Sequence, residues 1–481
     1  MDANVSRRDA LRALGAAVVG AAAGGCSGTA PGGRTLSDPP YSPSQEELIA
    51  IWTEHNVLVN VTRDESRPGA PVVALSVSLR QVGSKHQIPT GYGVSLYELA
   101  QFSELTSLTL SDFSGDELKA LAPLQKLTSL TLSWRPTGYG NYAPFASGSG
   151  RELKALAPLQ KLTSLTLSGY DGKGLKELAP LQNLTRLDLQ GCWSIREEDW
   201  QELPALKNLT ILVLKNQQIW TSTLRRLHEI GLLHVLVGQA TTEGGKRAAK
   251  PEDVVSLDLC DAFLGDCVFG KDVRRDDGPM ELAPLTNLRT LKLARTGLSD
   301  KGLKHLGLSR NLTTLDLRGT AVTDVGLKEL AALRSLTSLN LRDTAVTDEG
   351  LKHLGGCRNL TTLDLRNTAV TGAGLKELAS LTNLTEIGLG GTPLTDIGIN
   401  ALAALKKLTA LHLSGVRASA DIRSTEAAGW AASQVTDAKL KGLVALKNLT
   451  AIYLEDTEVT RDGEEELRKA LPSCKIRRFG Q

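Results

Sequence analysis

Residues 312–335 read LTTLDLRGTAVTDVGLKELAALRS, and this 24-residue unit returns along the chain at a constant period. Its first half alternates apolar and polar residues, with Leu315 and Leu317 on the same side, as in a strand with one buried face. The second half changes to helical spacing, and Thr323 or Asp324 stands where a residue would cap the helix. Each unit is therefore predicted to contain one strand followed by one helix.

The period is exact in the middle of the chain, where six units start 24 residues apart. These starts are Leu288, Leu312, Leu336, Leu360, Leu384 and Leu408. Less regular starts are Val72, Leu105, Leu127, Leu162, Leu184, Leu209, Leu232, Val254 and Leu449. A single unit cannot bury its own apolar face, so copies must stack. We predict an α/β solenoid of horseshoe form, with parallel strands on the concave face and short helices on the convex face.

The GLKELA segment of these units resembles the bacterial branch of the leucine-rich-repeat family, and residues 467–476 (LRKALPSCKI) resemble its usual ending. Residues 184–192 (LTRLDLQGC) resemble the ribonuclease-inhibitor-like, cysteine-containing subclass known from F-box substrate receptors. The resemblance implies a leucine-rich-repeat solenoid that recognises proteins and has no catalytic centre.

The predicted organisation has five parts, with the repeats at its centre. These are an export signal in 1–26, a flexible tether in 27–44, an N-terminal cap and first strand in 45–100, the repeats in 101–460 and a C-terminal cap in 461–481. Three insertions, 134–150, 260–280 and 415–435, each begin just after a strand, which predicts that they share one rim of the solenoid.

The N-terminal segment resembles a bacterial export signal. Arg7 and Arg8 lie in a twin-arginine-like motif, and Cys26 follows Ala-Gly-Gly in a lipobox-like context, although Ala10 and Ala23 depart from the favoured residues. The resemblance implies a signal peptide, an extracytoplasmic place in the cell envelope and a lipoprotein whose membrane contact is a lipid on Cys26. If the signal is not used, the protein stays in the cytoplasm.

Composition excludes several classes of function. The chain has 55 basic and 53 acidic residues, so no overall field favours nucleic acid. No nucleophile elbow, phosphate loop or HExxH motif is present, so we expect no enzyme, cofactor or metal site.

Cys260 and Cys267 lie in one insertion and form a disulfide or remain free thiols. We expect a monomer with a protein partner.

Two repeating polar positions are predicted to be structural. The first is a threonine that replaces the usual turn asparagine and can hydrogen-bond the backbone. Its members are Thr296, Thr320, Thr344, Thr368, Thr392 and Thr457. The second is an N-x-T sequon that recurs with the repeat at Asn183, Asn208, Asn311, Asn359, Asn383 and Asn448. Its register comes from the repeat, which argues against glycosylation.

Two surfaces are candidates for binding. On the concave face the outward residues form two columns, Asp316, Asn340 and Asp364 in one and Arg318, Arg342 and Arg366 in the other. Either the Asp column neutralises the arginines, which we favour, or an anionic ligand or an acidic patch of a partner does. On the rim, the insertions concentrate aromatic residues, which are typical of interfaces. The rim candidates are Trp134, Tyr142, Phe263, Phe269 and Trp430.

The sequence thus favours a non-catalytic protein-recognition module, exported and lipid-anchored. Two alternatives stay open. The first is a structural envelope spacer without a dedicated ligand, which fits the Ser/Thr-rich outward positions of the N-terminal half. The second is a cytoplasmic scaffold resembling F-box-type substrate receptors.

Overall fold

The computed structural model divides the chain into two compact units, unit 1 up to Thr210 and unit 2 from Ile211 onward. It describes residues 44–54, 58–78, 96–113, 115–134, 151–170, 174–192, 195, 200, 203–236, 240–246, 248–264, 268–269, 272–273, 278–414 and 435–478. The predicted export signal and tether, with Arg7, Arg8 and Cys26, lie outside these residues.

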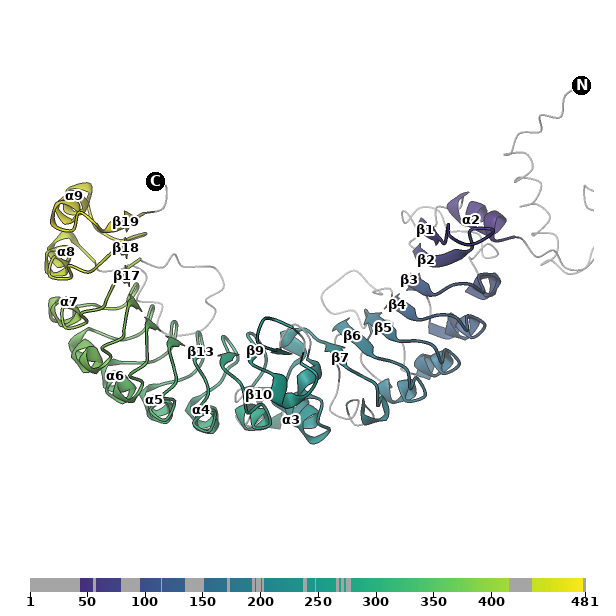
Figure 1. Cartoon of the computed structure of the whole chain (residues 1–481), viewed down its shortest axis with the longest axis horizontal. Coiled ribbons are helices and arrows are strands. Elements are labelled where there is room, and N and C mark those ends of the chain that lie inside the picture. Colours follow the sequence, from purple (N-terminus) through teal and green to yellow (C-terminus); the bar gives the residue numbers. More distant parts are fainter. Residues whose placement is uncertain are drawn as a thin grey trace, which may run out of the picture. The chain divides into compact units, whose positions relative to one another are not determined.

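Unit 1 begins with a cap and continues as stacked repeats (Figure 1). The cap consists of α2 (Gln45–Glu54), which buries Leu48 and Trp52, and β1 (Leu58–Arg63), which pairs antiparallel with β2 (Val72–Ser78). Parallel strands follow: β3 (Ser107–Phe113), β4 (Ser129–Trp134), β5 (Ser164–Ser168) and β6 (Arg186–Gly191). The second layer is made of short 3₁₀ helices: η1 (Leu96–Gln101), η2 (Gly115–Leu121), η3 (Arg151–Leu156), η4 (Leu175–Leu178) and η6 (Leu203–Ala205).

Unit 2 contains the exact repeats. Its strands are β7 (Ile211–Val213), β8 (Ala240–Thr241), β9 (Ser256–Asp258), β12 (Thr290–Lys292), β13 (Thr314–Asp316), β14 (Ser338–Asn340), β15 (Thr362–Asp364), β16 (Glu386–Gly388), β17 (Ala410–His412), β18 (Ala451–Tyr453) and β19 (Lys475–Arg477). The strands from β9 to β19 in this list form one parallel sheet. The opposite layer holds α4 (Asp300–Leu306), α5 (Asp324–Leu330), α6 (Asp348–Leu351), η11 (Lys352–Gly356), η12 (Ala373–Ser380), α7 (Asp396–Leu402), α8 (Asp437–Leu443) and α9 (Arg461–Ala470).

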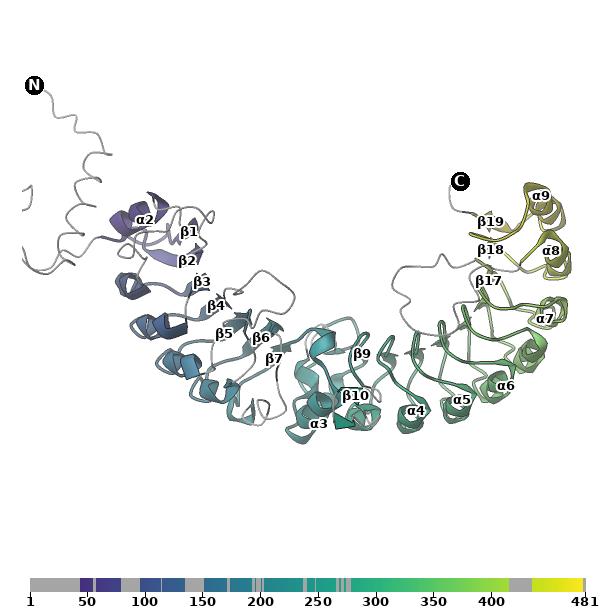
Figure 2. The same ribbon diagram turned by 180° about the vertical axis from the view of Figure 1, so that it is seen from behind.

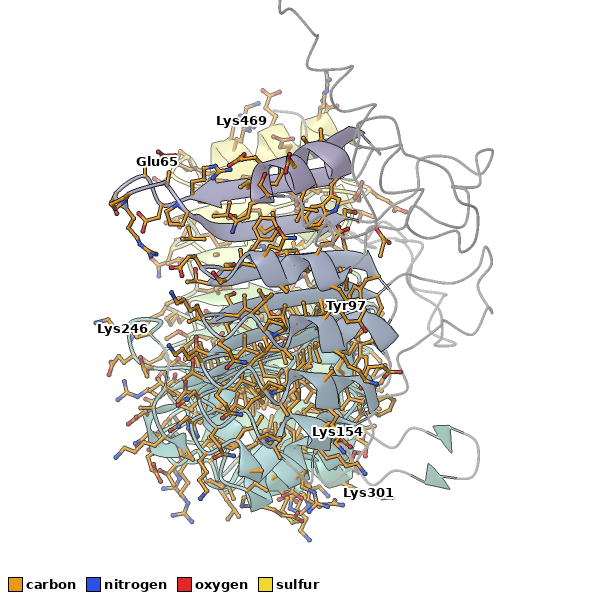
Figure 3. The ribbon with its side chains drawn as sticks, turned by 90° about the vertical axis from the view of Figure 1, so that its right-hand side faces the viewer. Glu65, Tyr97, Lys154, Lys246, Lys301 and Lys469 are labelled. Atoms are coloured by element: carbon orange, nitrogen blue, oxygen red, sulfur yellow. The ribbon has the colours of Figure 1, made fainter. Side chains whose placement is uncertain are left out.

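The core lies between these two layers in each unit. Leu315 pairs in register with Leu339, and Leu339 with Leu363, and all three are at most 1% exposed. In each unit the helices lie on the side away from the strands (Figure 2). Leu303 and Leu306 of α4 are fully buried, whereas Lys301 in α4 and Lys469 in α9 are exposed (Figure 3). The predicted α/β solenoid with parallel strands and short helices is confirmed.

The predicted helix cap is also confirmed. The Thr323 side chain accepts a hydrogen bond from the Val325 backbone N–H, and Thr347 does the same in α6. Asp324 is the first residue of α5 rather than its cap. Its carboxylate instead accepts hydrogen bonds from the Thr347 N–H (2.8 Å) and hydroxyl (2.6 Å) of the next repeat.

The unit predicted to start at Leu232 is wrong as a parallel strand. In the described part of this segment, a short 3₁₀ helix, η8 (Leu233–Val235), precedes β8, which pairs antiparallel with β9. The parallel contact is one isolated bridge between Leu212 and Leu236. The segment has no LxxLxL spacing to supply inward leucines, so tertiary contacts decide its conformation.

The repeat of β7 instead contacts the repeat of β9 directly. The Phe263 N–H donates to the Ile219 carbonyl (2.9 Å), and the Asn216 side chain donates to the Cys260 carbonyl (2.7 Å). Residues 260–264 therefore belong to the stacked repeats, and the predicted insertion 260–280 begins too early. Its later part includes the hairpin of β10 (Val268–Phe269) and β11 (Asp272–Val273) and the 3₁₀ helix η10 (Gly278–Leu282).

Candidate functional site

The strand face of unit 2 carries the two predicted columns in exact register. Asp316 pairs with Asn340 and Asn340 with Asp364 along β13, β14 and β15. The parallel ladder continues past the strand ends, because the Gly319 N–H donates to the Arg342 carbonyl (2.9 Å). Equivalent side chains on neighbouring strands therefore start about 4.8 Å apart.

The first column has a structural role that the sequence reasoning missed. Oδ1 of Asp316 accepts a hydrogen bond from the Arg318 N–H (3.0 Å), and Asp364 accepts one from the Arg366 N–H (3.1 Å). In the same way, the side-chain amide oxygen of Asn340 accepts a hydrogen bond from the Arg342 N–H (3.0 Å). Such turns need only a short side chain with an oxygen, which explains why Asp and Asn alternate here. The turn ends in a left-handed residue at Gly319, Asp343 and Asn367.

The three arginines of the second column differ in their ion pairing. The Arg366 guanidinium forks onto Asp364, with Nε–Oδ1 at 2.9 Å and Nη2–Oδ2 at 2.6 Å, and this hydrogen bonding raises the pKa of Arg366. Arg342 lies 3.3 Å from Asp343, a carboxylate outside the predicted Asp column. Arg318 has no ion pair among the residues that the structure describes. Neutralisation by the Asp column therefore holds for Arg366 and not for the other two.

The face continues toward the C-terminus with a row that sequence reasoning did not single out. Glu386 contacts His412 (2.8 Å), the His412 ring stacks on Tyr453 with centroids 4.1 Å apart, and Arg477 lies over the same ring. Consecutive strands from β16 to β19 supply the four residues, and the strand register predicted from LxxLxL spacing would have located them. The predicted columns end at Asp364 and Arg366, and Gly388 and Gly390 hold the corresponding positions of the next repeat.

The rim prediction is wrong for Trp134. Trp134 is the last residue of β4, not the first of an insertion, and only 4% of it is exposed. Its ring packs against Phe113 at 4.9 Å and Tyr170 at 5.1 Å between centroids. A side chain on Gly169 would collide with the Trp134 carbonyl, so the backbone is also closely packed here. Trp134 is a core residue.

The other predicted rim aromatics lie in different parts of the structure or outside the described residues. Phe263 stacks on Trp220, with centroids 4.3 Å apart, and so joins two repeats. Phe269 lies in the β10–β11 hairpin. Tyr142 and Trp430 lie outside the described residues.

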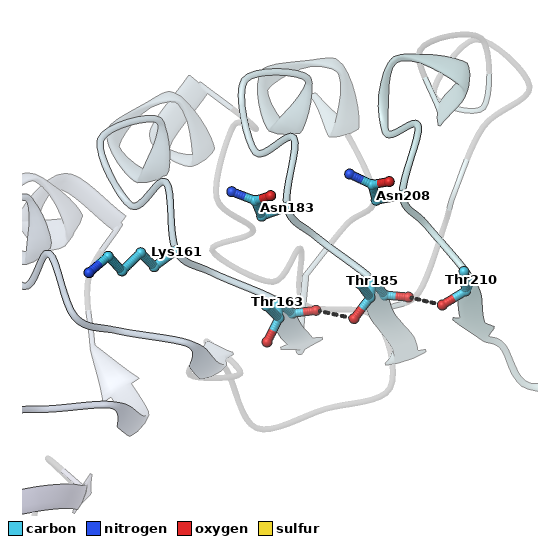
Figure 4. Close-up of a pocket in the computed structure, with 6 residues that line it drawn as sticks. All are labelled: Lys161, Thr163, Asn183, Thr185, Asn208 and Thr210. Carbon is cyan, nitrogen blue, oxygen red and sulfur yellow. Dashed lines mark hydrogen bonds between the residues drawn. The ribbon is translucent and has the colours of Figure 1, made fainter.

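The repeating Asn and Thr residues connect neighbouring repeats through their side chains (Figure 4). Asn183 donates to the Gln160 carbonyl (2.8 Å), and Asn208 donates to that of Gln182 (2.9 Å). The hydroxyls of Thr185 and Thr210 donate to the preceding threonine carbonyl. An open groove lies along this edge, lined by Lys161, Thr163, Asn183, Thr185, Asn208 and Thr210. Because the Asn amides and Thr hydroxyls bind backbone, the sequons have a structural explanation.

The turn threonines are structural as predicted. From Thr296 to Thr392 they are buried, and each hydroxyl donates to the carbonyl three residues earlier, as Thr320 does to Leu317 at 2.6 Å. Thr457 makes the same bond at 2.9 Å while partly buried.

Of the cysteines that the structure describes, Cys192, Cys357 and Cys474 are buried and Cys260 is half-buried, and all four are free. Cys267, the predicted partner of Cys260, lies outside the described residues. Burial, reinforced by a hydrogen bond with Asp258, raises the pKa of the Cys260 thiol to about 11. Cys357 is fully buried in the core, and burial raises its pKa to about 11 as well.

Among the described residues, no cluster of His, Cys, Asp and Glu has the arrangement of a metal site. In the same part of the chain, no helix combines the length and apolarity needed to cross a bilayer.

Comparison with protein families agrees with this geometry. Residues 94–217 match the R13L1/DRL21 leucine-rich repeats. The segments 285–307, 308–331, 332–355 and 356–379 each match a leucine-rich-repeat model. The repeats are leucine-rich repeats. Proteins with such repeats are typically interaction modules.

Several solved leucine-rich-repeat structures resemble the chain. An internalin (InlF) from Listeria monocytogenes is 16% identical with a TM-score of 0.38, and the match covers 93% of this chain and 99% of that one. A leucine-rich-repeat protein of Leptospira interrogans is 20% identical with a TM-score of 0.41, covering 79% and 91%. The ectodomain of the Arabidopsis thaliana receptor kinase GASSHO1/SCHENGEN3, in complex with CASPARIAN STRIP INTEGRITY FACTOR 2, is 17% identical with a TM-score of 0.36, covering 79% and 44%. No curated protein matches the chain.

Proposed function

We propose that this leucine-rich-repeat protein is a non-catalytic recognition module that binds a protein partner on the strand face of unit 2. The supporting observation is a contrast between the two units. In unit 1 the outward positions of β4 and β5 are hydroxyl residues, such as Ser129, Thr131 and Ser133 on β4, and β6 carries the ion pair of Arg186 and Asp188. In unit 2 the position before the inward residue stays Thr or Ser from β12 to β15. The position after the inward residue carries mostly charged or aromatic side chains: Lys292, Asp316, Asp364, His412, Tyr453 and Arg477, with Asn340 in β14 and Gly388 in β16.

The fold itself does not need these charges, since β4 and β5 of unit 1 pair with each other without them. A half-buried charge loses hydration, and an ion pair returns little of that loss near the surface. Serine and threonine would be the less costly residues at these positions. The charged and aromatic set in unit 2 is therefore better explained by a binding role than by stability.

A steric block on the strand face tests this proposal. Ser338 lies between Thr314 and Thr362 on the neighbouring strands, so Ser338→Trp places a large ring on the face without removing a charge. The control is Lys328→Trp on exposed Lys328 of α5, in the helical layer. Partners would be captured by crosslinking from envelope fractions and quantified by mass spectrometry, with thermal unfolding as the check on folding.

We expect the parent and Lys328→Trp to capture the same stoichiometric protein and Ser338→Trp to lose it. Undiminished capture by Ser338→Trp would contradict a site on this face and would leave the rim aromatics Tyr142, Phe269 and Trp430 as candidates. If the parent captures nothing, the spacer alternative gains support, which the neutral hydroxyl face of unit 1 also favours.

We further propose that the protein is exported and anchored by a lipid on Cys26. The support is the sequence resemblance of Arg7, Arg8 and Cys26 to export and lipidation motifs.

A further inference from the structure

The arginines on the strand face of unit 2 differ in how completely their N–H donors are used. Arg295 binds both carboxylate oxygens of Asp261, with Nε–Oδ1 at 2.5 Å and Nη2–Oδ2 at 2.7 Å. Arg366 binds Asp364 in the same forked manner. A forked pair satisfies both the charge and the geometry of a guanidinium. These two arginines are therefore occupied.

Arg318 and Arg342 lie between them and make no forked pair of this kind with any described residue. Among the described residues, the Arg318 side chain makes no ion pair and no hydrogen bond; its backbone N–H alone contacts Asp316. Nε of Arg342 is buried and lies 3.3 Å from Asp343 without forming a hydrogen bond. Asp343 already accepts a 2.6 Å hydrogen bond from Asn367.

The sequence around the two arginines explains this difference. Asn340 stands where the neighbouring strands have Asp316 and Asp364, so β14 has no carboxylate in that column. The Asp316 carboxylate is partly used by the turn that it closes. Gly319 has no side chain, and Arg295 packs over it, with its Cγ 3.1 Å from where a Cβ would lie. The Arg295 guanidinium binds Asp261 and makes no hydrogen bond with Arg318.

The resulting arrangement presents two neighbouring guanidinium groups with free donors. Their backbones are adjacent in the parallel ladder, since the Gly319 N–H bonds the Arg342 carbonyl and the Arg295 N–H bonds the Arg318 carbonyl. The two side chains start from neighbouring strands about 4.8 Å apart, so their like charges repel each other. An anion placed between the two guanidinium groups relieves that repulsion. A carboxylate has two oxygens and can accept from both groups at once.

We propose that Arg318 and Arg342 form the subsite that receives a carboxylate from an acidic segment of the protein partner. This inference rests on the proposed function and specifies its chemistry. Asp316 and Asp343 supply negative charge beside the subsite, so the two guanidinium groups together accept one carboxylate of an acidic peptide at a time.

The test uses a defined probe, an N-acetylated hexaglutamate peptide titrated into the full-length protein at low ionic strength by calorimetry. We expect Arg318→Gln and Arg342→Gln each to weaken binding by about tenfold or more, because each removes a donor that the carboxylate uses. Arg295→Gln removes the same net charge from the neighbouring strand and is the matched control. Its effect should stay within about twofold, since Asp261 already occupies that guanidinium.

Three outcomes would overturn the inference. Hexaglutamate that does not bind the parent, or an equal loss in Arg295→Gln and Arg342→Gln, would show that no specific carboxylate subsite exists. Tighter binding of inorganic phosphate than of the peptide would assign the subsite to a small anion instead. The proposed function is judged separately, because the capture experiment with Ser338→Trp uses no acidic probe and leaves both arginines in place.

Discussion

At the scale of single residues, alternate positions along a strand of this protein have opposite roles. Leu339 in β14 is 1% exposed and faces the core, whereas its neighbour Asn340 faces the open side. Replacing a buried leucine by alanine removes apolar contacts and leaves a cavity. Replacing an outward residue removes only what its polar group contributes, here one hydrogen bond to the Arg342 N–H.

We predict that Leu339→Ala lowers the free energy of unfolding by about 2–5 kcal/mol and Asn340→Ala by about 1 kcal/mol. Denaturant unfolding of the purified variants, followed by circular dichroism, measures both values under the same conditions. Equal losses at the two positions would contradict the register of β14.

The arginines show what residue-level reasoning can and cannot reach. The register of Arg318, Arg342 and Arg366 follows from the 24-residue period, and the structure confirms it. Their pairing does not follow from the period, because it depends on side-chain direction and on which carboxylates the turns already use. Arg366 meets Asp364 on its own strand, while the equivalent Asp316 makes no ion pair with Arg318 among the described residues.

At the scale of elements, the helical layer is held together by aspartates at the helix starts. Asp300, Asp324, Asp348 and Asp437 each accept hydrogen bonds from the N–H and hydroxyl of a threonine just before the next helix. These bonds lower the pKa of Asp437, so its carboxylate loses them only as the pH falls through that lowered pKa. The close approach requires glycine three residues after each of these threonines, as at Gly374, where a Cβ would lie 2.7 Å from the Asp348 Cα.

Asp348 and Asp396 provide a matched comparison for this connection. Both are the first residue of their helix, but Asp348 bonds Thr371 of the next repeat, and Asp396 makes no such bond within the described residues. We predict that Asp348→Ala lowers the free energy of unfolding by about 1–2 kcal/mol more than Asp396→Ala does. Thermal and denaturant unfolding test this difference. If the two variants lose the same stability, helix capping accounts for the whole effect and the connection between repeats contributes nothing.

The elements that the sequence predicted well are those whose neighbours repeat the same spacing. From Leu288 to Leu408 each strand and each helical segment lies where the period places it, because every unit stacks on a copy of itself. The predictions at Leu232 and Trp134 were wrong where that regularity ends. A tryptophan after LxxLxL reads as the start of a loop, but in β4 it continues the strand and fills the space between Phe113 and Tyr170.

At the scale of the whole molecule, the two units show how one repeat pattern carries different surfaces. Inward leucines determine the fold in both, and the outward positions are free to vary. β4 and β5 of unit 1 have hydroxyl side chains there, whereas the strands of unit 2 add charged and aromatic ones, such as Asp316, His412 and Tyr453. Fold and recognition are therefore encoded at alternate positions of the same strands, which is why the sequence predicted the fold in detail and the binding surface only in outline.

The proposed localisation of the protein in the cell envelope depends on Arg7, Arg8 and Cys26. If Cys26 carries the lipid, its thiol sulfur is the attachment atom, and Cys26→Ser removes it. We expect this variant to lose metabolic labelling with palmitate and to leave the membrane fraction. Cys260→Ser is the control, since burial raises the pKa of that thiol and it is no lipid acceptor in the proposal.

The arginine pair tests export separately from anchoring. Replacing Arg7 and Arg8 together by lysine keeps both charges but removes the planar guanidinium groups. An export receptor that recognises these groups should no longer bind the signal. We expect the double variant to accumulate in the cytoplasm, as measured by fractionation and immunoblotting, while Cys26→Ser is still exported and appears soluble outside the cytoplasm. Unchanged membrane association in both variants would contradict the anchor and the signal together. In that case the strand face of unit 2 would meet cytoplasmic partners, and the capture with Ser338→Trp should be repeated on cytoplasmic fractions.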